Sequence, residues 1–141
     1  MTSTAKPVLT GGCQCGAVRY EVTGPVLKVY VCHCDECRKQ SASAFGISAF
    51  VPREALRLTH GTPRWWSRQT DSGRVLDCAF CPDCGSRLWH QRAEMADIVT
   101  VKAGSLDEPI DISDAVHIWT ARKLPGVVIP TSARTYEHEP E

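Results

Sequence analysis

The stretch Cys32-His33-Cys34-Asp35-Glu36-Cys37 places three thiols within six residues. Two more cysteine clusters flank it, Gly11-Gly12-Cys13-Gln14-Cys15-Gly16 before it and Cys78-Ala79-Phe80-Cys81-Pro82-Asp83-Cys84-Gly85 after it. Thiols one or two residues apart in turns that contain glycine or proline can converge on one ion, at about 2.3 Å for zinc. No tight cluster holds the four ligands of tetrahedral zinc, so each metal must recruit ligands from distant parts of the chain and contribute to folding.

The eight cysteines are interpreted as metal ligands rather than as disulfide partners. Met1 to Leu9 contains one lysine and no apolar segment of the length that a secretory signal needs, so we expect a cytoplasmic protein. Disulfides are rare in that reducing compartment. A redox pair among Cys32, Cys34 and Cys37 is an alternative, but no thioredoxin-like βαβ pattern surrounds it. Iron is a second alternative, since it also suits four thiolates.

Length and charge narrow the class of protein. With 141 residues, the chain is expected to form a single zinc-binding domain over 1–141, with an ordered core at about 8–136 and short polar termini. The longest apolar stretches, such as 124–130, are too short to cross a bilayer. Lys plus Arg and Asp plus Glu both count 16, so charge gives no support for a nucleic-acid partner.

Short runs rich in Val, Tyr, Phe and Trp, bounded by turn residues, predict strands. The expected strands are 17–22, 26–32, 45–51, 64–68, 74–80, 98–103 and 116–119. Thr70-Asp71-Ser72-Gly73 is typical of a hairpin loop. Helical signal is limited to 35 to about 45 and to a turn at 52–56. The sequence therefore predicts a mainly β fold with few short helical turns.

The cysteines divide into two expected sites. Pro82-Asp83 followed by Gly85 is typical of a zinc knuckle, in which backbone amides turn toward the sulfurs. The first site would then have four ligands: Cys13, Cys15, Cys81 and Cys84. The second would have three: Cys32, Cys34 and Cys37. Such a three-thiolate site could keep a fourth position for water or a substrate thiol.

Three motifs together carry a family resemblance: Gly-Gly-Cys-Gln-Cys-Gly-Ala-Val-Arg-Tyr at 11–20, Cys-His-Cys-Asp-Glu-Cys-Arg-Lys at 32–39, and Phe-Cys-Pro-Asp-Cys-Gly-Ser at 80–86. In order and spacing they resemble the glutathione-dependent formaldehyde-activating enzyme family, and the likeness extends from about Leu9 to Trp119. The resemblance implies several small antiparallel sheets packed around two zinc ions. It also implies a carbon-sulfur lyase type of activity that joins formaldehyde to the glutathione thiol.

Carried over residue by residue, the resemblance makes the first cysteine set a structural zinc site and assigns Cys32, Cys34 and Cys37 to a catalytic zinc. Two features depart from the family pattern. Cys78 is an additional cysteine; strand alternation would turn it away from Cys81, and it could then be a fourth ligand of the second zinc. Lys123-Leu124-Pro125-Gly126 lacks the tryptophan that relatives often have after the proline, so a pocket wall near Trp119 would differ.

Candidate substrate residues follow from position and charge. Ser41 to Phe45 follows Cys37 directly, so Ser41 and Phe45 are expected to face the substrate. Trp119 is a candidate pocket wall. Lys123 is a candidate for binding a carboxylate of glutathione, together with Arg38, Lys39 and Arg122, although ordinary solvated charges are the simpler interpretation.

Other side chains have a structural and a functional interpretation. His33 is expected to point away from the thiolates beside it, and His117 to be a hydrogen-bonded, half-buried histidine rather than a proton carrier. Adjacent Trp65 and Trp66 must face opposite sides of an extended strand, so one of them could line a cleft.

Two functions are compatible with these features. The first is a zinc-dependent carbon-sulfur lyase that acts on an adduct of a small thiol, such as glutathione, and an aldehyde, such as formaldehyde. The second is a non-catalytic module with two closed structural zinc sites that binds a protein or small-molecule partner. They differ in whether the metal at Cys32, Cys34 and Cys37 keeps a free coordination position, which Cys78 could fill.

Overall fold

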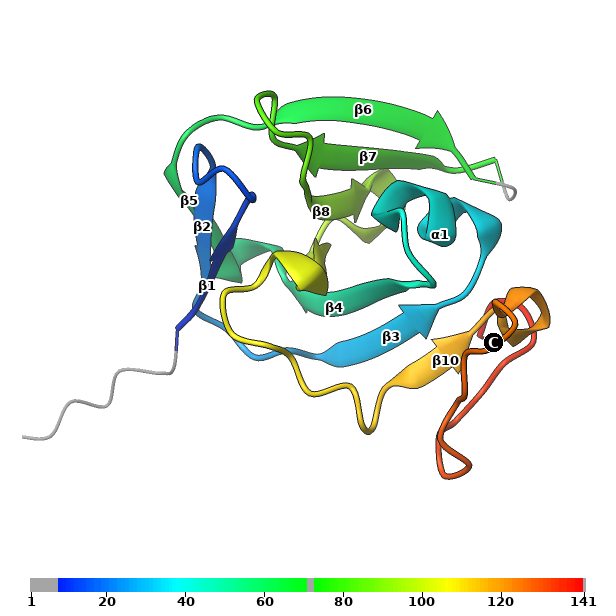
Figure 1. Ribbon diagram of the computed structural model, residues 1–141. Coiled ribbons are helices and arrows are strands. Elements are labelled where there is room, and N and C mark those ends of the chain that lie inside the picture. Colours follow the sequence, from blue (N-terminus) through cyan, green and yellow to red (C-terminus); the bar gives the residue numbers. More distant parts are fainter. Residues whose placement is uncertain (1–7, 71–72, 141) are drawn as a thin grey trace, which may run out of the picture.

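The computed structural model describes residues 8–70 and 73–140, and its strands there form two sheets (Figure 1). The three-stranded sheet has the order β1 (Leu9–Gly12), β2 (Arg19–Val22), β5 (Leu56–His60). The seven-stranded sheet has the order β10 (Val116–Ile118), β3 (Lys28–Cys32), β4 (Gly46–Pro52), β9 (Ile98–Lys102), β8 (Arg87–Arg92), β7 (Val75–Phe80), β6 (Arg64–Gln69). The predicted mainly β fold is confirmed.

Helical structure is short throughout the described residues. The α-helix α1 covers Asp35–Ser41, and four 3₁₀ turns cover Arg53–Ala55, Ala93–Met95, Ala103–Ser105 and Thr120–Arg122. None of these helices has the length to span a membrane.

Each of the seven predicted strands is present, with shifted ends, but the sequence did not predict β1, β5 and β8. β1 reads Leu-Thr-Gly-Gly and β5 has four exposed residues out of five, so neither shows the alternation of a half-buried strand. A second difference concerns β10, which pairs in parallel with β3, whereas the other strand pairs described are antiparallel. A parallel partner far along the chain leaves no local turn signal.

The helix after the second cysteine cluster ends earlier than its sequence suggested. Cys34 is its N-cap, and the sulfur of Cys34 accepts a hydrogen bond from the Cys37 amide at 3.3 Å. Ala42 ends the helix in the left-handed region, with φ of 51°. The hydroxyl of Ser41, at the end of the helix, lies within hydrogen-bond distance of the carbonyl oxygens of Cys37, at 2.7 Å, and of Phe45, at 3.2 Å, and the second contact ties the following loop back onto the helix.

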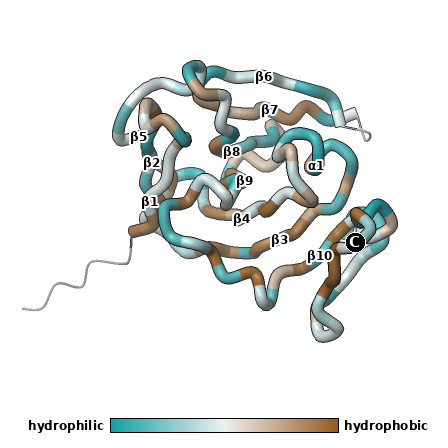
Figure 2. Tube along the Cα trace, viewed as in Figure 1, coloured by the Kyte–Doolittle hydropathy of each residue, from teal (hydrophilic) through white to brown (hydrophobic). Residues whose placement is uncertain are grey.

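The two faces of the seven-stranded sheet differ in character. Residues directly opposite in neighbouring strands point to the same face. One face carries Val99, Val101, Ala49, Val51 and Trp89, which pack with Tyr20 and Val22 of the three-stranded sheet in the main hydrophobic core. The other face carries Trp66, Cys78, His90 and Lys102. Figure 2 shows the contrast between hydrophobic β3 and β10 and hydrophilic α1.

Some expectations fall partly outside the described residues. The predicted hairpin loop joins antiparallel β6 and β7, and the Thr70 amide donates to the Arg74 carbonyl oxygen at 2.7 Å. Asp71 and Ser72 of that loop, and the expected polar terminus 1–7, lie outside the described residues. The C-terminal segment makes contacts beyond residue 136: the amide of Trp119 donates to the carbonyl oxygen of His138 at 3.1 Å.

The close approach of β1 to the core gives a first prediction. Gly11 lies opposite Tyr20, and a Cβ at Gly11 would lie 2.5 Å from the Tyr20 ring and 2.7 Å from the backbone oxygen of Ser105. The Gly11→Ala substitution should therefore lower the free energy of unfolding by about 1–3 kcal/mol through overpacking. Gly104→Ala is the matched control, because nothing lies within 4 Å of its added Cβ. Equal melting temperatures for both variants would contradict this packing argument.

Candidate metal centres

The first group of sulfurs joins two distant turns of the chain. The four members, whose sulfur atoms all lie within 4.8 Å of one another, are Cys13, Cys15, Cys81 and Cys84. The Cys15 sulfur lies 3.6 Å from that of Cys13 and 3.7 Å from that of Cys81. A tetrahedral ion with bonds of about 2.3 Å to sulfur needs edges of about 3.8 Å. The donor set and its spacing therefore fit a zinc ion.

Backbone amides surround this group as expected for thiolates. The Cys13 sulfur accepts from the Val18 amide at 3.2 Å, and the Cys81 sulfur accepts from the amides of Asp83 and Cys84 at 3.3 and 3.5 Å. Hydrogen bonds from the Ser86 hydroxyl and amide lower the pKa of Cys84 to about 5. Positive φ at Gly85, of 81°, allows the tight turn that aims these amides.

The second group lies where β3 meets α1. It contains Cys32, Cys34 and Cys37, whose sulfurs also lie within 4.8 Å of one another. Hydrogen bonds with Cys32 and Cys34 lower the pKa of Cys37 to about 3, while hydrogen bonds with Cys34 and Cys37 raise the pKa of Cys32. Three sulfurs this close cannot all be ionised unless a cation balances them, which is the electrostatic reason to expect a metal ion here.

Cys78 is not part of either group of mutually close ligand atoms in the described chain. It is fully buried, opposite Trp66 on β6 and His90 on β8, and its sulfur lies 4.0 Å from the Leu76 carbonyl oxygen. Burial raises the pKa of its thiol. The structure therefore does not bring the expected fourth sulfur to the second group.

The histidine between two of these cysteines contacts another histidine. The Nε2 atom of His33 lies 2.9 Å from Nδ1 of His117, and the two rings are stacked at 5.2 Å. Burial lowers the pKa of both, that of His33 to about 4. Both rings are buried and hydrogen-bonded, so the pair links β10 to the turn that follows β3.

An open groove of about 770 Å³ lies along the first sulfur group, and it approaches the second through Gln40 and Gly46, which lie next to Cys37. Ser41, Ser43 and Phe45 line it, together with Cys13 and Cys84 of the first group. Two of the expected substrate residues, Ser41 and Phe45, are thus placed on this groove.

The other two expected substrate residues lie elsewhere. Trp119 and Lys123 do not line the groove. The indole nitrogen of Trp119 donates to the Glu139 carboxylate at 2.9 Å, and the Lys123 ammonium donates to the Val127 carbonyl oxygen at 2.7 Å. Trp119 has a positive φ of 56°, and the chain turns there into a 3₁₀ turn held by the C-terminal segment. Sequence position alone gave no sign of these partners.

Lys102 is a groove residue that the sequence reasoning missed. Its side chain is only 8% exposed, and its ammonium donates to the Ser48 hydroxyl at 2.8 Å. Burial lowers its pKa, and the charges of the second sulfur group, Cys37 foremost, oppose that shift. A Cβ at Gly46 would lie 3.2 Å from Cβ of Cys37 and 3.5 Å from the Lys102 nitrogen, so the glycine keeps the space between them open. A lysine at the end of the apolar strand 98–102 was the available signal.

Comparison with known proteins identifies the family to which the chain belongs. The family model described as glutathione-dependent formaldehyde-activating enzyme matches residues 8–122. The chain belongs to this family. The match covers both sulfur groups and the residues that line the groove.

Relatives and a solved structure agree with this placement. Two fungal proteins named as candidate glutathione-dependent formaldehyde-activating enzymes match at 33% identity over 55% of this chain, in Penicillium rubens, and at 29% over 62%, in Emericella nidulans. The matches span only 40% and 46% of those relatives' lengths. A Halomonas elongata protein of the same name is 28% identical over 86% of this chain and 81% of its own. A crystal structure of a Rhodobacter sphaeroides protein superposes with a TM-score of 0.59 at 26% identity, over 77% of this chain and 98% of that one.

The sulfur geometry predicts the metal content of the protein and of two variants. Wild type should hold two zinc ions per chain, and Cys34→Ala should lose one of them, because two sulfurs cannot retain the second ion. Cys78→Ala should keep both, since Cys78 lies outside either group. Metal analysis with zinc K-edge absorption, which counts sulfur ligands, makes the measurement. Retention of both ions by Cys34→Ala, or loss of one by Cys78→Ala, would contradict the assignment.

Proposed function

We propose that this protein is a zinc-dependent carbon-sulfur lyase that catalyses the reversible addition of a small thiol, glutathione, to formaldehyde. The observation that carries the proposal is the second sulfur group: three converging sulfurs without a fourth among the described residues, next to an open groove. The family membership and the names of the relatives support the choice of thiol and aldehyde. The first group, with four sulfurs, is assigned to a structural zinc ion.

The donor set suits this chemistry. A zinc ion held by Cys32, Cys34 and Cys37 would supply a positive charge that keeps a substrate sulfur in its thiolate form. Three thiolate ligands bring so much negative charge that they favour a soft sulfur ligand over hydrolytic chemistry. The position of Cys78 outside this group supports the open site over a closed binding module.

Residues of the groove would stabilise the charge that develops during the addition. Addition forms a carbon-sulfur bond, moves the carbonyl π electrons onto oxygen, and transfers the thiol proton to that oxygen. The positive charge of Lys102, buried beside the second sulfur group, is placed to stabilise the negative oxygen as it develops. A side chain at position 46 would crowd Cys37 and the Lys102 ammonium, so Gly46 allows the two to lie close together.

Exchange spectroscopy tests the proposal directly. Glutathione and ¹³C-formaldehyde reach equilibrium with their adduct without a catalyst, so NMR exchange rates at equilibrium report catalysis. Zinc-loaded wild type and Cys78→Ala should accelerate the exchange, whereas Cys37→Ala should leave it at the rate of buffer. Absence of acceleration by a wild-type sample that holds two zinc ions would refute the function.

The role of Lys102 gives a separate prediction. Lys102→Met keeps the length of the buried side chain and removes its charge, so kcat for adduct formation should fall roughly tenfold or more, with zinc content unchanged. Ser48→Ala removes only the hydroxyl partner of the ammonium, and it should cost much less. Equal rates for wild type and Lys102→Met would remove this residue from the mechanism.

A further inference from the structure

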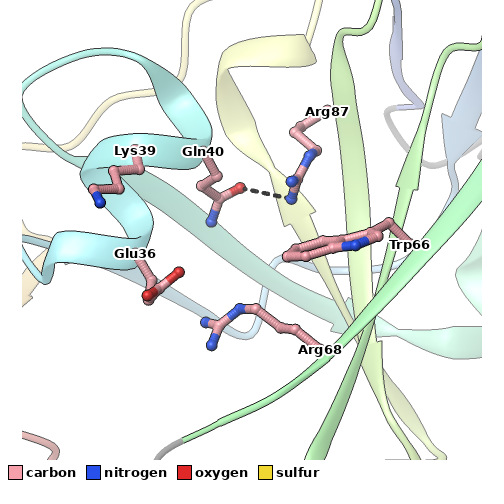
Figure 3. Close-up of a pocket in the computed structure, with 6 residues that line it drawn as sticks. All are labelled: Glu36, Lys39, Gln40, Trp66, Arg68 and Arg87. Atoms are coloured by element: carbon pink, nitrogen blue, oxygen red, sulfur yellow. Dashed lines mark hydrogen bonds between the residues drawn. The ribbon is translucent and has the colours of Figure 1, made fainter.

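A second, smaller cavity lies beside α1. It has a volume of about 220 Å³, is open to solvent, and lies between α1 on one side and β6 and β8 on the other (Figure 3). Its lining residues are Glu36, Lys39, Gln40, Trp66, Arg68 and Arg87. Ser41 and Phe45 line the groove but not this cavity, so the cavity offers further contacts beyond the groove residues considered so far.

The charged side chains of this cavity have no ion-pair partner among the described residues. Three of them are cationic and one is acidic. The neighbouring Asp35, by contrast, approaches Arg38 at 3.7 Å and Arg122 at 3.8 Å. Figure 3 shows the carboxylate of Glu36 and the guanidinium of Arg68 pointing into the same space from opposite walls. A ligand with both charges could lie between them.

Arg87 and Trp66 form a fixed floor for the cavity. The Arg87 guanidinium lies 5.5 Å from the centre of the Trp66 ring, and its Nη1 lies 3.2 Å from Nε2 of His90. Burial lowers the pKa of His90 to about 2, so this histidine is neutral and its Nε2 can accept from Arg87. Trp66 itself is 50% exposed, which leaves ring surface free for a ligand.

One glutamine connects this cavity to the second sulfur group. The Gln40 amide nitrogen donates to the Cys37 sulfur at 3.8 Å, and its oxygen accepts from Arg87 at 3.5 Å. Gln40 and Arg87 also line the large groove, so the two hollows are contiguous. A molecule that fills the small cavity therefore begins one side chain away from Cys37.

We propose that this cavity binds the zwitterionic α-amino acid end of the thiol co-substrate. Arg68 and Arg87 hold its carboxylate, Glu36 faces its ammonium, and the adjoining chain lies on the exposed part of the Trp66 ring. Arginine guanidinium groups suit planar carboxylates, and charge-assisted hydrogen bonds are the stronger ones. The carboxylate of Glu36 disfavours a simple dianion such as phosphate in the same space. This inference rests on the proposed function, because it orients the thiol of that reaction toward Cys37.

Two thioether probes test the cavity without the chemistry. S-methylglutathione keeps the zwitterionic end but has no thiol, and its N-acetyl derivative carries a neutral amide in place of the ammonium. Calorimetry on the zinc-loaded full chain should show that wild type binds S-methylglutathione more tightly than the N-acetyl derivative. Arg68→Gln should weaken both about tenfold, in line with one charge-assisted hydrogen bond. Arg64→Gln, on the same strand but outside the lining, is the matched control and should change neither.

Glu36→Gln separates the ammonium contact from general effects. It should weaken the binding of S-methylglutathione about tenfold and should not weaken the binding of the N-acetyl derivative, because that probe has no ammonium for Glu36 to contact. Equal effects of Glu36→Gln on both probes, equal effects of Arg68→Gln and Arg64→Gln, or no binding of S-methylglutathione to wild type would each overturn the proposal. Because neither probe reacts, this result is independent of turnover: the predicted affinities without accelerated exchange would refute the function and keep the cavity assignment.

Discussion

The convergence of sulfurs from distant turns is the constraint on which the rest of the structure depends. Cys15 and Cys81 are 66 residues apart, and their sulfurs lie 3.7 Å from each other. A cross-link that closes a loop of this length removes about 4 kcal/mol of chain entropy from the unfolded state. The segment inside that loop contains β2 to β7 and the whole second sulfur group. A metal ion in the first group would therefore stabilise the scaffold that positions the second.

Side chains along each strand of the seven-stranded sheet alternate between its two faces, so the same strands form the core and the site. On β9, Val99 and Val101 face the core, while Lys102 faces the groove. On β8, Trp89 packs in the core, while His90 faces Arg87. The same strands thus supply both the apolar packing and the charged groups. Because the core side holds each strand in place, the groove side chains are held on rigid elements, which is what precise binding of a small molecule requires.

The sequence revealed the sulfur groups because their signal is local. Two thiols one or two residues apart indicate a turn and a pair of metal ligands within the same few residues. The remaining step was to combine these pairs into complete sites. Arg68 has no such signal, and for Lys102 the only local sign is a lysine at the end of an apolar strand, because strand register decides which side chains lie near the sulfur groups. Trp119 and Lys123 looked like groove residues because nothing local showed that the C-terminal segment would take the indole of Trp119 as a partner.

For Cys78, strand alternation correctly predicted the face of the sheet, but the order of the strands decides which groups lie near it. In the described structure, Cys81 packs in the core with Ala79 and Cys78 lies outside that cluster, on the face that carries His90. Yet Cys78 is on β7 and Cys32 is on β3, and the strands β4, β9 and β8 lie between them in the sheet. Neighbouring strands are about 4.8 Å apart, so sharing a face does not bring two thiols to one ion. The buried thiol instead lies opposite Trp66, which lines the small cavity beside α1, and its raised pKa keeps it neutral. Strand order, which no spacing of cysteines encodes, is what leaves the second sulfur group with three members.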